Sequence, residues 1–407
     1  MPVLTRRGWT LLAGALALTS SGRLFGIPEL FVFAVAAVAL VAGAAIYVGL
    51  ARYRVSALRQ VRPPRVHAGG GSRVELSVRN LAGRRSPVLA AKDPFDGGRR
   101  WARFNLAPLD AGETARAAYR LPTEQRGLFA LGPLQISLTD PFGLATSTAT
   151  AAPQTSLTVY PRIDVIRALP HSPGPDPNAS ATHPTALSLS GDDFYALREY
   201  QAGDDIRRVH WPSTARLDEL MIRQDELPWQ GRTTVVADLR SVVHTPESFE
   251  LVVSAVASIL TASWRTSSLT RMLTTDGTDS GFGSGHSHRE AMLEYLAAAA
   301  PHDGLSLMSV LGGLGRRGST GGLSVVTTSR AAGQDLAAAA VVRPGFGLST
   351  LVLFERTSWD ASTAAAQAPI RSVPPVGRLV RVSGSVPFVQ AWDAAIVSGR
   401  TRAGTRV

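Results

Sequence analysis

The apolar run from Ile27 to Leu50 is the feature that most constrains how this chain can fold. A helix that spans a bilayer needs about 20 apolar residues, and this run exceeds that length with only Pro28 and Glu29 interrupting its start. A shorter run, Trp9 to Thr19, reaches spanning length only if its flanking residues are included. We therefore predict a two-helix membrane hairpin over residues 1–52.

Arginines beside the two runs predict the orientation of this hairpin. Arg6 and Arg7 precede the first run, five arginines follow the second between Arg52 and Arg65, and the short connection carries only Arg23. Because positively charged flanks stay in the cytoplasm, we expect a multi-pass protein of the cell membrane whose two termini and soluble domains are cytoplasmic. A signal peptide is the rival interpretation, but no small-residue cleavage site precedes a polar segment.

Composition excludes several classes of function. A chain of 407 residues is long enough for two or three domains, and the absence of cysteine excludes disulfides, thiolate catalysis and cysteine-ligated metals. The net charge of +11 is almost entirely due to arginine, since Lys92 is the only lysine. These arginines are scattered and no nucleic-acid reader motif occurs, so we expect no nucleic-acid partner.

Residues 66–162 have the pattern of a β domain. Residues 73–80 alternate polar and apolar side chains with a period of two, which is typical of a half-buried strand. We predict an immunoglobulin-like β-sandwich here, with Asp93 and Asp140 serving turns in two Asp-Pro-Phe sequences, and a Pro/Ser-rich linker over residues 163–190. Further predicted strands are Thr114 to Leu121, Gly127 to Leu131, Leu134 to Leu138 and Thr155 to Tyr160.

From residue 231 to 402 the pattern changes to alternating strands and helices, which favours an open, doubly wound α/β domain. Thr233 to Ala237 reads as a buried parallel strand, followed by a helix with Thr245 as N-cap and Pro246 at its first position. Later strands are predicted at Arg271 to Thr275, Leu323 to Thr328, Thr350 to Phe354 and Leu379 to Val382, and helices at Arg289 to Ala299, Gln334 to Val342, Asp360 to Gln367 and Phe388 to Ser398.

A dense block of opposite charges and aromatic residues occupies residues 191–226, between the linker and the α/β domain. Two interpretations remain open: the charges form an ion-pair network that seats the block against the sheet, or they form a docking face for a partner. The residues singled out as this signature are Asp193, Phe194, Leu197, Arg198, Tyr200, Gly203, Asp204, Arg207, His210, Trp211, Ala215 and Arg216.

The pattern G-D-D-F-x-x-L-R-E-Y-x-x-G-D-D-x-R-x-x-H-W-x-x-T-A-R, beginning at Gly191, resembles the signature of the domain-of-unknown-function 58 family. Three further stretches resemble motifs of the same family, starting at Arg126 (R-G-L-F-A-L-G-P-L), Asp140 (D-P-F-G-L) and Val159 (V-Y-P-R). The resemblance implies a membrane-anchored bacterial protein with a von Willebrand factor A-like domain.

In von Willebrand factor A-like folds the first strand ends in D-x-S-x-S, whose oxygens help to hold a divalent cation. Here the matching positions keep Asp238, whereas Arg240 and Val242 replace the two serines. A guanidinium would repel a cation and could pair with Asp238 instead, so we expect a degenerate site with no metal and no cofactor. Asp276 follows the second strand and does not match the family's distal aspartate.

Other motifs suggest no chemistry. The G-x-G-x-x-G run from Gly313 to Gly318 follows a helix and precedes a strand, the reverse of a dinucleotide site. His286 and His288 are expected in a solvated Gly/Ser-rich loop, and His210 as a structural histidine. We find no signature of an enzyme.

These patterns predict a membrane-tethered, non-enzymatic adaptor. The resemblance implies a MoxR-type AAA+ ATPase and a transglutaminase-like membrane protein as partners. The alternative is a divalent-metal-dependent binding protein or enzyme centred on Asp238.

Overall fold

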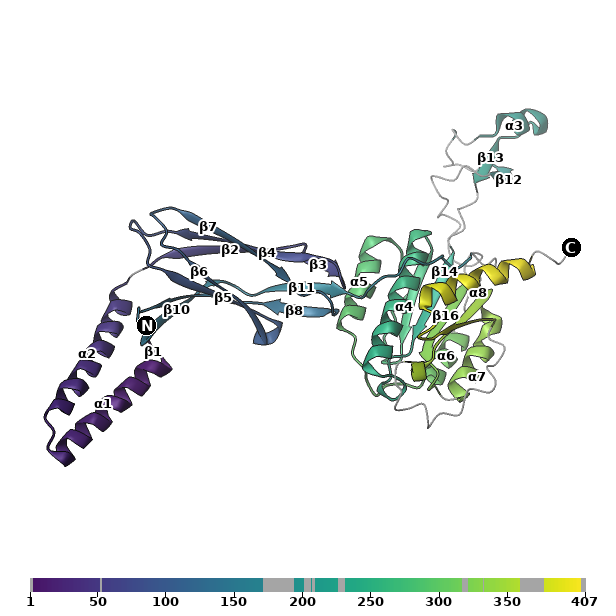
Figure 1. Ribbon diagram of the computed structural model, residues 1–407. Coiled ribbons are helices and arrows are strands. Elements are labelled where there is room, and N and C mark those ends of the chain that lie inside the picture. The colour runs from purple at the N-terminus through teal and green to yellow at the C-terminus, as the bar shows by residue number, and fades with distance from the viewer. Residues whose placement is uncertain are drawn as a thin grey trace. The chain divides into compact units, whose positions relative to one another are not determined.

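The structure, a computed structural model, describes residues 3–51, 53–170, 194–200, 206, 209–225, 231–316, 321–331, 333–358 and 377–403. The chain divides into two compact units, Met1–Arg162 and Ile163–Val407. The fold is mixed α/β with several sheets, which confirms the predicted combination of an all-β and an α/β part at this coarse level (Figure 1).

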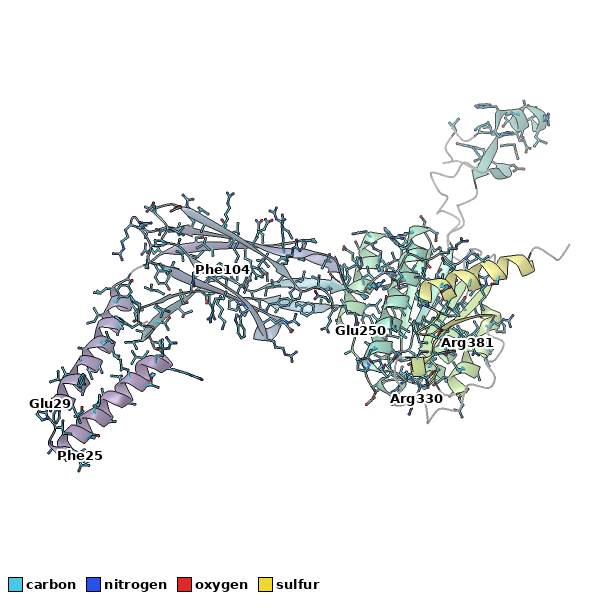
Figure 2. The ribbon with its side chains drawn as sticks, in the orientation of Figure 1. Phe25, Glu29, Phe104, Glu250, Arg330 and Arg381 are labelled. Atoms are coloured by element: carbon cyan, nitrogen blue, oxygen red, sulfur yellow. The ribbon has the colours of Figure 1, made fainter. Side chains whose placement is uncertain are left out.

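Two helices open the first unit, α1 (Arg6–Phe25) and α2 (Glu29–Leu50), and they pack against each other. Figure 2 shows Phe25 and Glu29 at the short turn that joins them. Gly22 permits the close approach at this turn, since a Cβ there would lie 3.2 Å from the carbonyl oxygen of Ile27. Within the described part of the chain, α2 alone is long and apolar enough to cross a membrane by length and composition.

The base of the helix pair is joined to the β domain through the Asp140 turn. As the sequence predicts, Asp140 accepts hydrogen bonds from backbone N–H groups, those of Phe142, Leu144 and Ala145. Thr5, the N-cap of α1, donates its hydroxyl to the carbonyl of Gly143 at 2.6 Å. A small apolar cluster from α2 and this turn covers the junction. The D-P-F-G-L motif therefore has a structural role, because it packs the helix pair against the β domain.

The β domain consists of two sheets that pack face to face. One has the order β1-β10-β9-β5-β8-β11-β3 with β6 added beside β5, and the other has the order β2-β4-β7. Their strands are β1 (Val3–Leu4), β2 (Val55–Arg62), β3 (Arg65–His67), β4 (Ser72–Asn80), β5 (Leu89–Phe95), β6 (Arg100–Leu106), β7 (Thr114–Leu121), β8 (Gly127–Leu131), β9 (Leu134–Thr139), β10 (Ala145–Ala152) and β11 (Thr155–Tyr160).

A shared apolar core joins the two sheets. Val74, Leu76 and Val78 on alternate positions of β4 meet residues such as Leu89 and Ile136 from the opposite sheet. All strand pairs are antiparallel except β3 with β11. The period-two alternation therefore predicts this core correctly, since each inward side chain is buried and its neighbours face outward.

In this domain one sequence interpretation is incomplete and another is wrong. The segment after α2 is not only a positive membrane flank, because β2 begins at Val55 and buries the side chain of Arg59. Asp93 is not a turn residue: it lies inside β5, where its buried carboxylate pairs with the Arg59 guanidinium at 2.5 Å and accepts the Tyr119 hydroxyl at 2.7 Å. Burial, strengthened by the bond to Asp93, raises the pKa of Tyr119 far above its usual value.

The second unit is built on a parallel sheet with the order β15-β14-β16-β17-β18. One face of the sheet packs on α6 and α7 through Val236, Leu323, Leu311 and Leu336, among others. The strands are β14 (Arg232–Ala237), β15 (Leu269–Thr274), β16 (Gly322–Thr328), β17 (Leu348–Phe354) and β18 (Arg378–Val382); the helices are α4 (Pro246–Arg265), α5 (Gly285–Ala298), α6 (Leu307–Arg316), α7 (Gly333–Val342) and α8 (Phe388–Ala403).

Local signals predict much of this unit. Thr245 caps α4 and Pro246 begins it, as expected. The predicted helix Asp360 to Gln367 and most of the predicted linker lie outside the described residues. The start of the linker is packed rather than solvated, since the Arg167 carbonyl accepts the indole N–H of Trp392 at 2.8 Å and Ile166 and Leu169 are buried.

His286 and His288 correct a further expectation. They lie in the first turn of α5, not in a loop, because this helix begins at Gly285. His286 lies 3.1 Å from the carboxylate of Glu290 one turn later, and the His288 imidazole bonds the carbonyl of Thr270 at 2.9 Å. Both histidines therefore have structural contacts, and no metal-ligand role is needed to explain them.

The signature block forms a small element of its own. Strands β12 (Phe194–Glu199) and β13 (Met221–Asp225) pair antiparallel, and helix α3 (Trp211–Leu217) lies between them in sequence. The backbone N–H of His210 donates to the carbonyl of Met221 at 2.8 Å, which ties α3 to β13. We call this element, residues 194–200, 206 and 209–225, the signature lobe.

Candidate functional site

Strand order places a candidate site at the carboxyl ends of β14 and β16. The chain passes from β14 to β15 on one side and then returns to β16 on the other side of β14. In open α/β sheets ligands bind where the strand order reverses in this way. Asp238 follows β14 directly, so its carboxylate lies at this point of the sheet.

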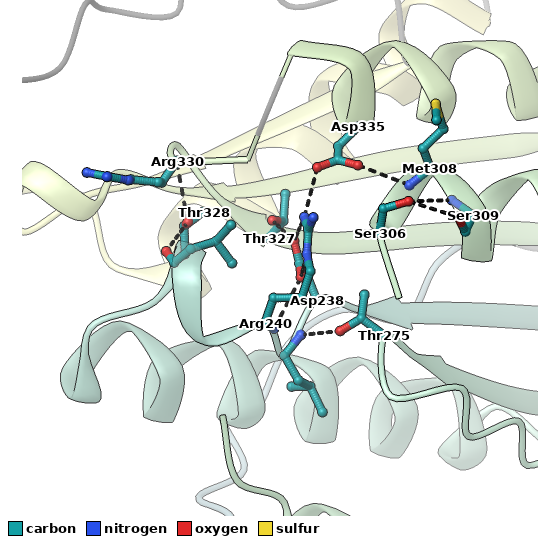
Figure 3. Close-up of polar contacts among 12 residues, drawn as sticks. Asp238, Arg240, Thr275, Ser306, Met308, Ser309, Thr327, Thr328, Arg330 and Asp335 are labelled. Atoms are coloured by element: carbon teal, nitrogen blue, oxygen red, sulfur yellow. Dashed lines mark hydrogen bonds and ion pairs between the residues drawn. The ribbon is translucent and has the colours of Figure 1, made fainter. Parts of the chain in front are cut away.

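An arginine lies between two buried carboxylates there. Arg240 Nε and Nη2 donate to the two carboxylate oxygens of Asp238, each at 2.8 Å, and Nη2 also donates to Asp335 Oδ2 at 2.9 Å. Figure 3 shows the Arg240 side chain held between these two aspartates. Neither carboxylate is accessible to bulk water, as Asp238 is 0% and Asp335 4% exposed. This Asp238–Arg240–Asp335 cluster is a fully paired ionic site.

Neighbouring polar groups fix the geometry of both carboxylates. The hydroxyl of Thr327, near the end of β16, donates to Asp238 Oδ2 at 2.8 Å, and the Met308 backbone N–H donates to Asp335 Oδ1 at 3.1 Å. Thr275 accepts the N–H of Leu239 at 2.9 Å and so holds the chain between Asp238 and Arg240. The cluster is therefore supported by residues at or just after the ends of β14, β15 and β16 and by helices α6 and α7.

Titration behaviour follows from this pairing. Hydrogen bonding to Asp238, opposed by burial, raises the pKa of Arg240 above its usual value, so the guanidinium stays charged. His244 lies beneath, its Nε2–H donating to the Asp238 carbonyl at 2.6 Å. Burial lowers the pKa of His244 against the opposing effect of Asp238, which favours a neutral imidazole. The site thus holds one permanent cation and a neutral histidine.

Sequence reasoning finds part of this cluster. It predicts that Arg240 pairs with Asp238, and the structure brings these two together. Val242, the third residue named, points away and is 64% exposed. Asp335 was missed, although an aspartate in the first turn of the helix after β16 is a usable signal. Asp276 lies apart, bonded to Thr274, Tyr295 and Thr278, and these hydrogen bonds outweigh burial and lower its pKa to about 2.

The signature residues are placed less completely. Asp193, Gly203, Asp204 and Arg207 lie outside the described residues, so the predicted ion-pair network is not tested. Phe194, Leu197 and Arg198 lie in β12, Tyr200 follows it, and Trp211, Ala215 and Arg216 lie in α3. His210 Nδ1 lies 2.8 Å from the Ser213 hydroxyl, a structural contact in the first turn of α3.

The lobe exposes much of its apolar surface. Val209, Met221 and Ile222 are buried, but Trp211 is 63% exposed and Ile206 also 63%. Leu217 and Leu220 are exposed as well. A two-stranded ribbon is only marginally stable without further packing, and this surface is large for so small an element.

Comparison with known families identifies the region that contains both features. The family model described as "Protein of unknown function DUF58" matches residues 196–343. This match assigns residues 196–343 to the DUF58 family. The matched DUF58 region extends from the signature lobe through β16 and α7, so it includes Asp238, Arg240 and Asp335. No curated protein matches the chain in sequence.

Three solved structures each resemble part of this chain. The CARDB domain of a Pyrococcus furiosus protein is 13% identical over 27% of this chain and 96% of its own, with a TM-score of 0.21. A β-glucosidase from Listeria innocua is 11% identical over 26% of this chain and 16% of its own, with a TM-score of 0.19. An alkylpurine DNA glycosylase from Pseudomonas fluorescens, bound to DNA with an abasic site analogue, is 12% identical over 29% of this chain and 34% of its own, with a TM-score of 0.21. None of these likenesses supports an argument about function.

Proposed function

We propose that this DUF58 protein is a membrane-tethered, non-enzymatic interaction protein whose α/β domain is von Willebrand factor A-like but holds an arginine in place of a cation. The observation that carries the proposal is the double pairing of Arg240 with Asp238 and Asp335. A guanidinium between both carboxylates provides one positive charge at the place where a divalent ion would otherwise bind. The domain then keeps its architecture without depending on a metal.

The parallel sheet supports the von Willebrand factor A-like interpretation. Its first strand, β14, ends at an aspartate whose side chain lies at the reversal of strand order. Two packed, mostly antiparallel sheets likewise support an immunoglobulin-like sandwich as the preceding domain.

The signature lobe supports a role in docking. Exposed Trp211 and Ile206, with Leu217 and Leu220, provide the aromatic and aliphatic surface that protein interfaces use. We propose that this surface binds a protein partner, with a MoxR-type AAA+ ATPase and a transglutaminase-like membrane protein as the partners implied by family resemblance.

A metal titration tests the non-enzymatic proposal. The full chain in neutral detergent should show no rise in melting temperature with Mg²⁺ or Mn²⁺, since the Arg240 guanidinium already bonds both carboxylates and repels a second cation. Tight binding of either ion that Asp238→Ala abolishes would overturn the proposal in favour of a metal-dependent protein. A fragment starting at Val66 is unsuitable for this titration, because it lacks β2 and therefore Arg59.

The helix pair is proposed as a membrane hairpin with both termini in the cytoplasm. Helix α2 has the length and composition of a span, and α1 packs along it. Arg6 and Arg7 at one end, with Arg52 and Arg54 at the other, favour retention of both ends in the cytoplasm.

Cysteine labelling in intact cells measures this topology. The chain has no cysteine, so each variant carries a single thiol. We expect an impermeant thiol reagent to label Phe25→Cys, at the helix turn, and not Ala111→Cys, on an exposed turn of the β domain, until the cells are lysed. Labelling of Ala111→Cys alone before lysis would reverse the proposed orientation.

A further inference from the structure

The positive charge of the protein belongs to its first unit. Residues 1–162 contain 20 of the 42 basic residues and 8 of the 31 acidic ones, a net charge of +12. This equals, within one charge, the +11 of the whole chain, so the second unit is close to neutral. The first unit therefore attracts anions more strongly than the second.

Three arginines lie directly opposite one another across the β2-β4-β7 sheet. The register pairs Arg62 of β2 with Arg73 of β4, and Arg73 with Arg120 of β7. All three face outward, because their neighbours in the alternating pattern, such as Val74 and Leu121, are buried. Residues directly opposite on one sheet face have Cβ atoms about 4.5–5.5 Å apart, and like charges in such pairs destabilise a sheet.

The local countercharge is too small to balance this row. Glu75 is the acidic residue paired with it, 2.7 Å from Arg73 Nη2 and 3.5 Å from Arg62 Nε. The Arg120 side chain makes no ion pair or hydrogen bond with any residue that the structure describes. One carboxylate therefore pairs with two of the three guanidinium groups, which leaves an excess of positive charge in the row.

An open pocket lies against this row. Its volume is about 560 Å³, and its lining contains Arg62, Arg73 and Arg120 together with the Gly69–Gly71 turn and Thr123, with no acidic residue among the lining groups. The backbone N–H of Gly71 donates to no group in the described residues and is free to bind an anion. Pockets of roughly 300–1,000 Å³ are the size that small molecules occupy.

We propose that this pocket binds a small soluble ligand that carries phosphate groups. Arginine forks match phosphate oxygens with paired, charge-assisted hydrogen bonds, and a bound anion would relieve the repulsion within the row. The size of the pocket favours a small molecule over an acidic protein surface.

The position of the pocket on β2 favours a soluble ligand over a lipid headgroup. Strand β2 begins at Val55, shortly after α2, and reaches Arg62 roughly 23 Å further along at about 3.3 Å per residue. The screening length at physiological ionic strength is about 8 Å, so the field of an anionic leaflet decays over a much shorter distance.

Pyrophosphate titration of the full chain in neutral detergent tests the proposal by calorimetry. Wild-type protein should bind pyrophosphate, and Arg73→Gln should weaken binding about tenfold or more, because it removes the guanidinium in the middle of the row. Arg79→Gln is the matched control: Arg79 lies on the same strand and face but opposite Ser56 and Thr114, so its loss should leave binding unchanged.

Thermal melting gives a second readout that a merely structural role would not produce. Pyrophosphate should raise the melting temperature of wild type and Arg79→Gln but not that of Arg73→Gln, which without ligand should melt no lower than wild type. Equal binding by Arg73→Gln, or equal loss in Arg79→Gln, would overturn the site. Binding to phosphatidylglycerol vesicles, or to an acidic protein, without any response to pyrophosphate would overturn the assignment of a small soluble ligand.

Discussion

Replacing Arg240 with serine should lower the free energy of unfolding of the α/β domain by about 3–5 kcal/mol, the cost of removing one partner from a buried ion pair. The change leaves the carboxylates of Asp238 and Asp335 inside the protein without the cation that now bonds both. Urea denaturation of the full chain, followed as a domain-specific transition, measures the loss.

A divalent cation should restore part of the stability of Arg240→Ser. The serine hydroxyl, the Thr327 hydroxyl and the two carboxylates are oxygen ligands of the type that Mg²⁺ and Mn²⁺ prefer. At a concentration about 100-fold above the dissociation constant, binding to the folded state adds about 2.7 kcal/mol. The same titration should have no effect on wild type.

Two variants control for this prediction. Arg240→Lys keeps a positive charge in place, so it should be destabilised less and should not respond to Mg²⁺. Adding Asp335→Asn to Arg240→Ser removes one of the two carboxylates and should weaken the response. A fully stable Arg240→Ser that ignores metal would show that the cluster is neither an essential ion pair nor the remnant of a cation site.

Local sequence signals predict most of the regular structure. The alternation in residues 73–80 identifies β4, and the Thr245-Pro246 pair identifies the start of α4, because each depends on a few neighbouring residues. The pairing of Arg240 with Asp238 is equally local, as the two lie two positions apart. Such features are readable because the contact and the pattern involve the same short segment.

Contacts between distant segments are not readable in this way. Asp335 lies 95 positions from Arg240, and only the order of strands in the sheet brings the two together. Arg59 and Asp93 are 34 positions apart, so each was interpreted from its own neighbours, one as a membrane flank and the other as a turn. A charged residue in a strand gives no local sign that its partner is buried opposite.

The second prediction with a large expected effect concerns the contribution of the Arg59–Asp93 pair to the stability of the β domain. Arg59 comes from the β2-β4-β7 sheet and Asp93 from the opposing sheet, with side chains 1% and 0% exposed. The pair is further bonded, since Arg59 Nη2 donates to the Leu131 carbonyl at 2.9 Å and the Tyr119 hydroxyl donates to Asp93. It is thus a polar link through the centre of an apolar core.

Arg59→Met should lower the free energy of unfolding of the β domain by about 3–5 kcal/mol, because it leaves the Asp93 carboxylate buried without a countercharge. Arg116→Met, an exposed change on the same sheet with no ion pair to any described residue, should change it by less than about 0.5 kcal/mol. Denaturation of the full chain in detergent measures both.

The decisive comparison adds two further changes to Arg59→Met. Replacing both charges and the hydroxyl, as in Arg59→Met with Asp93→Leu and Tyr119→Phe, removes every charged or hydroxyl group of the link at once. Replacing a whole buried ionic group by apolar residues is often neutral or stabilising, so this variant should recover most of the lost stability. If the triple variant remained as unstable as Arg59→Met, the loss of stability would come from buried carbonyls, such as that of Leu131, that no longer accept a hydrogen bond from Arg59. Arg59 would then stabilise the domain through its bonds to the backbone rather than through its pairing with Asp93.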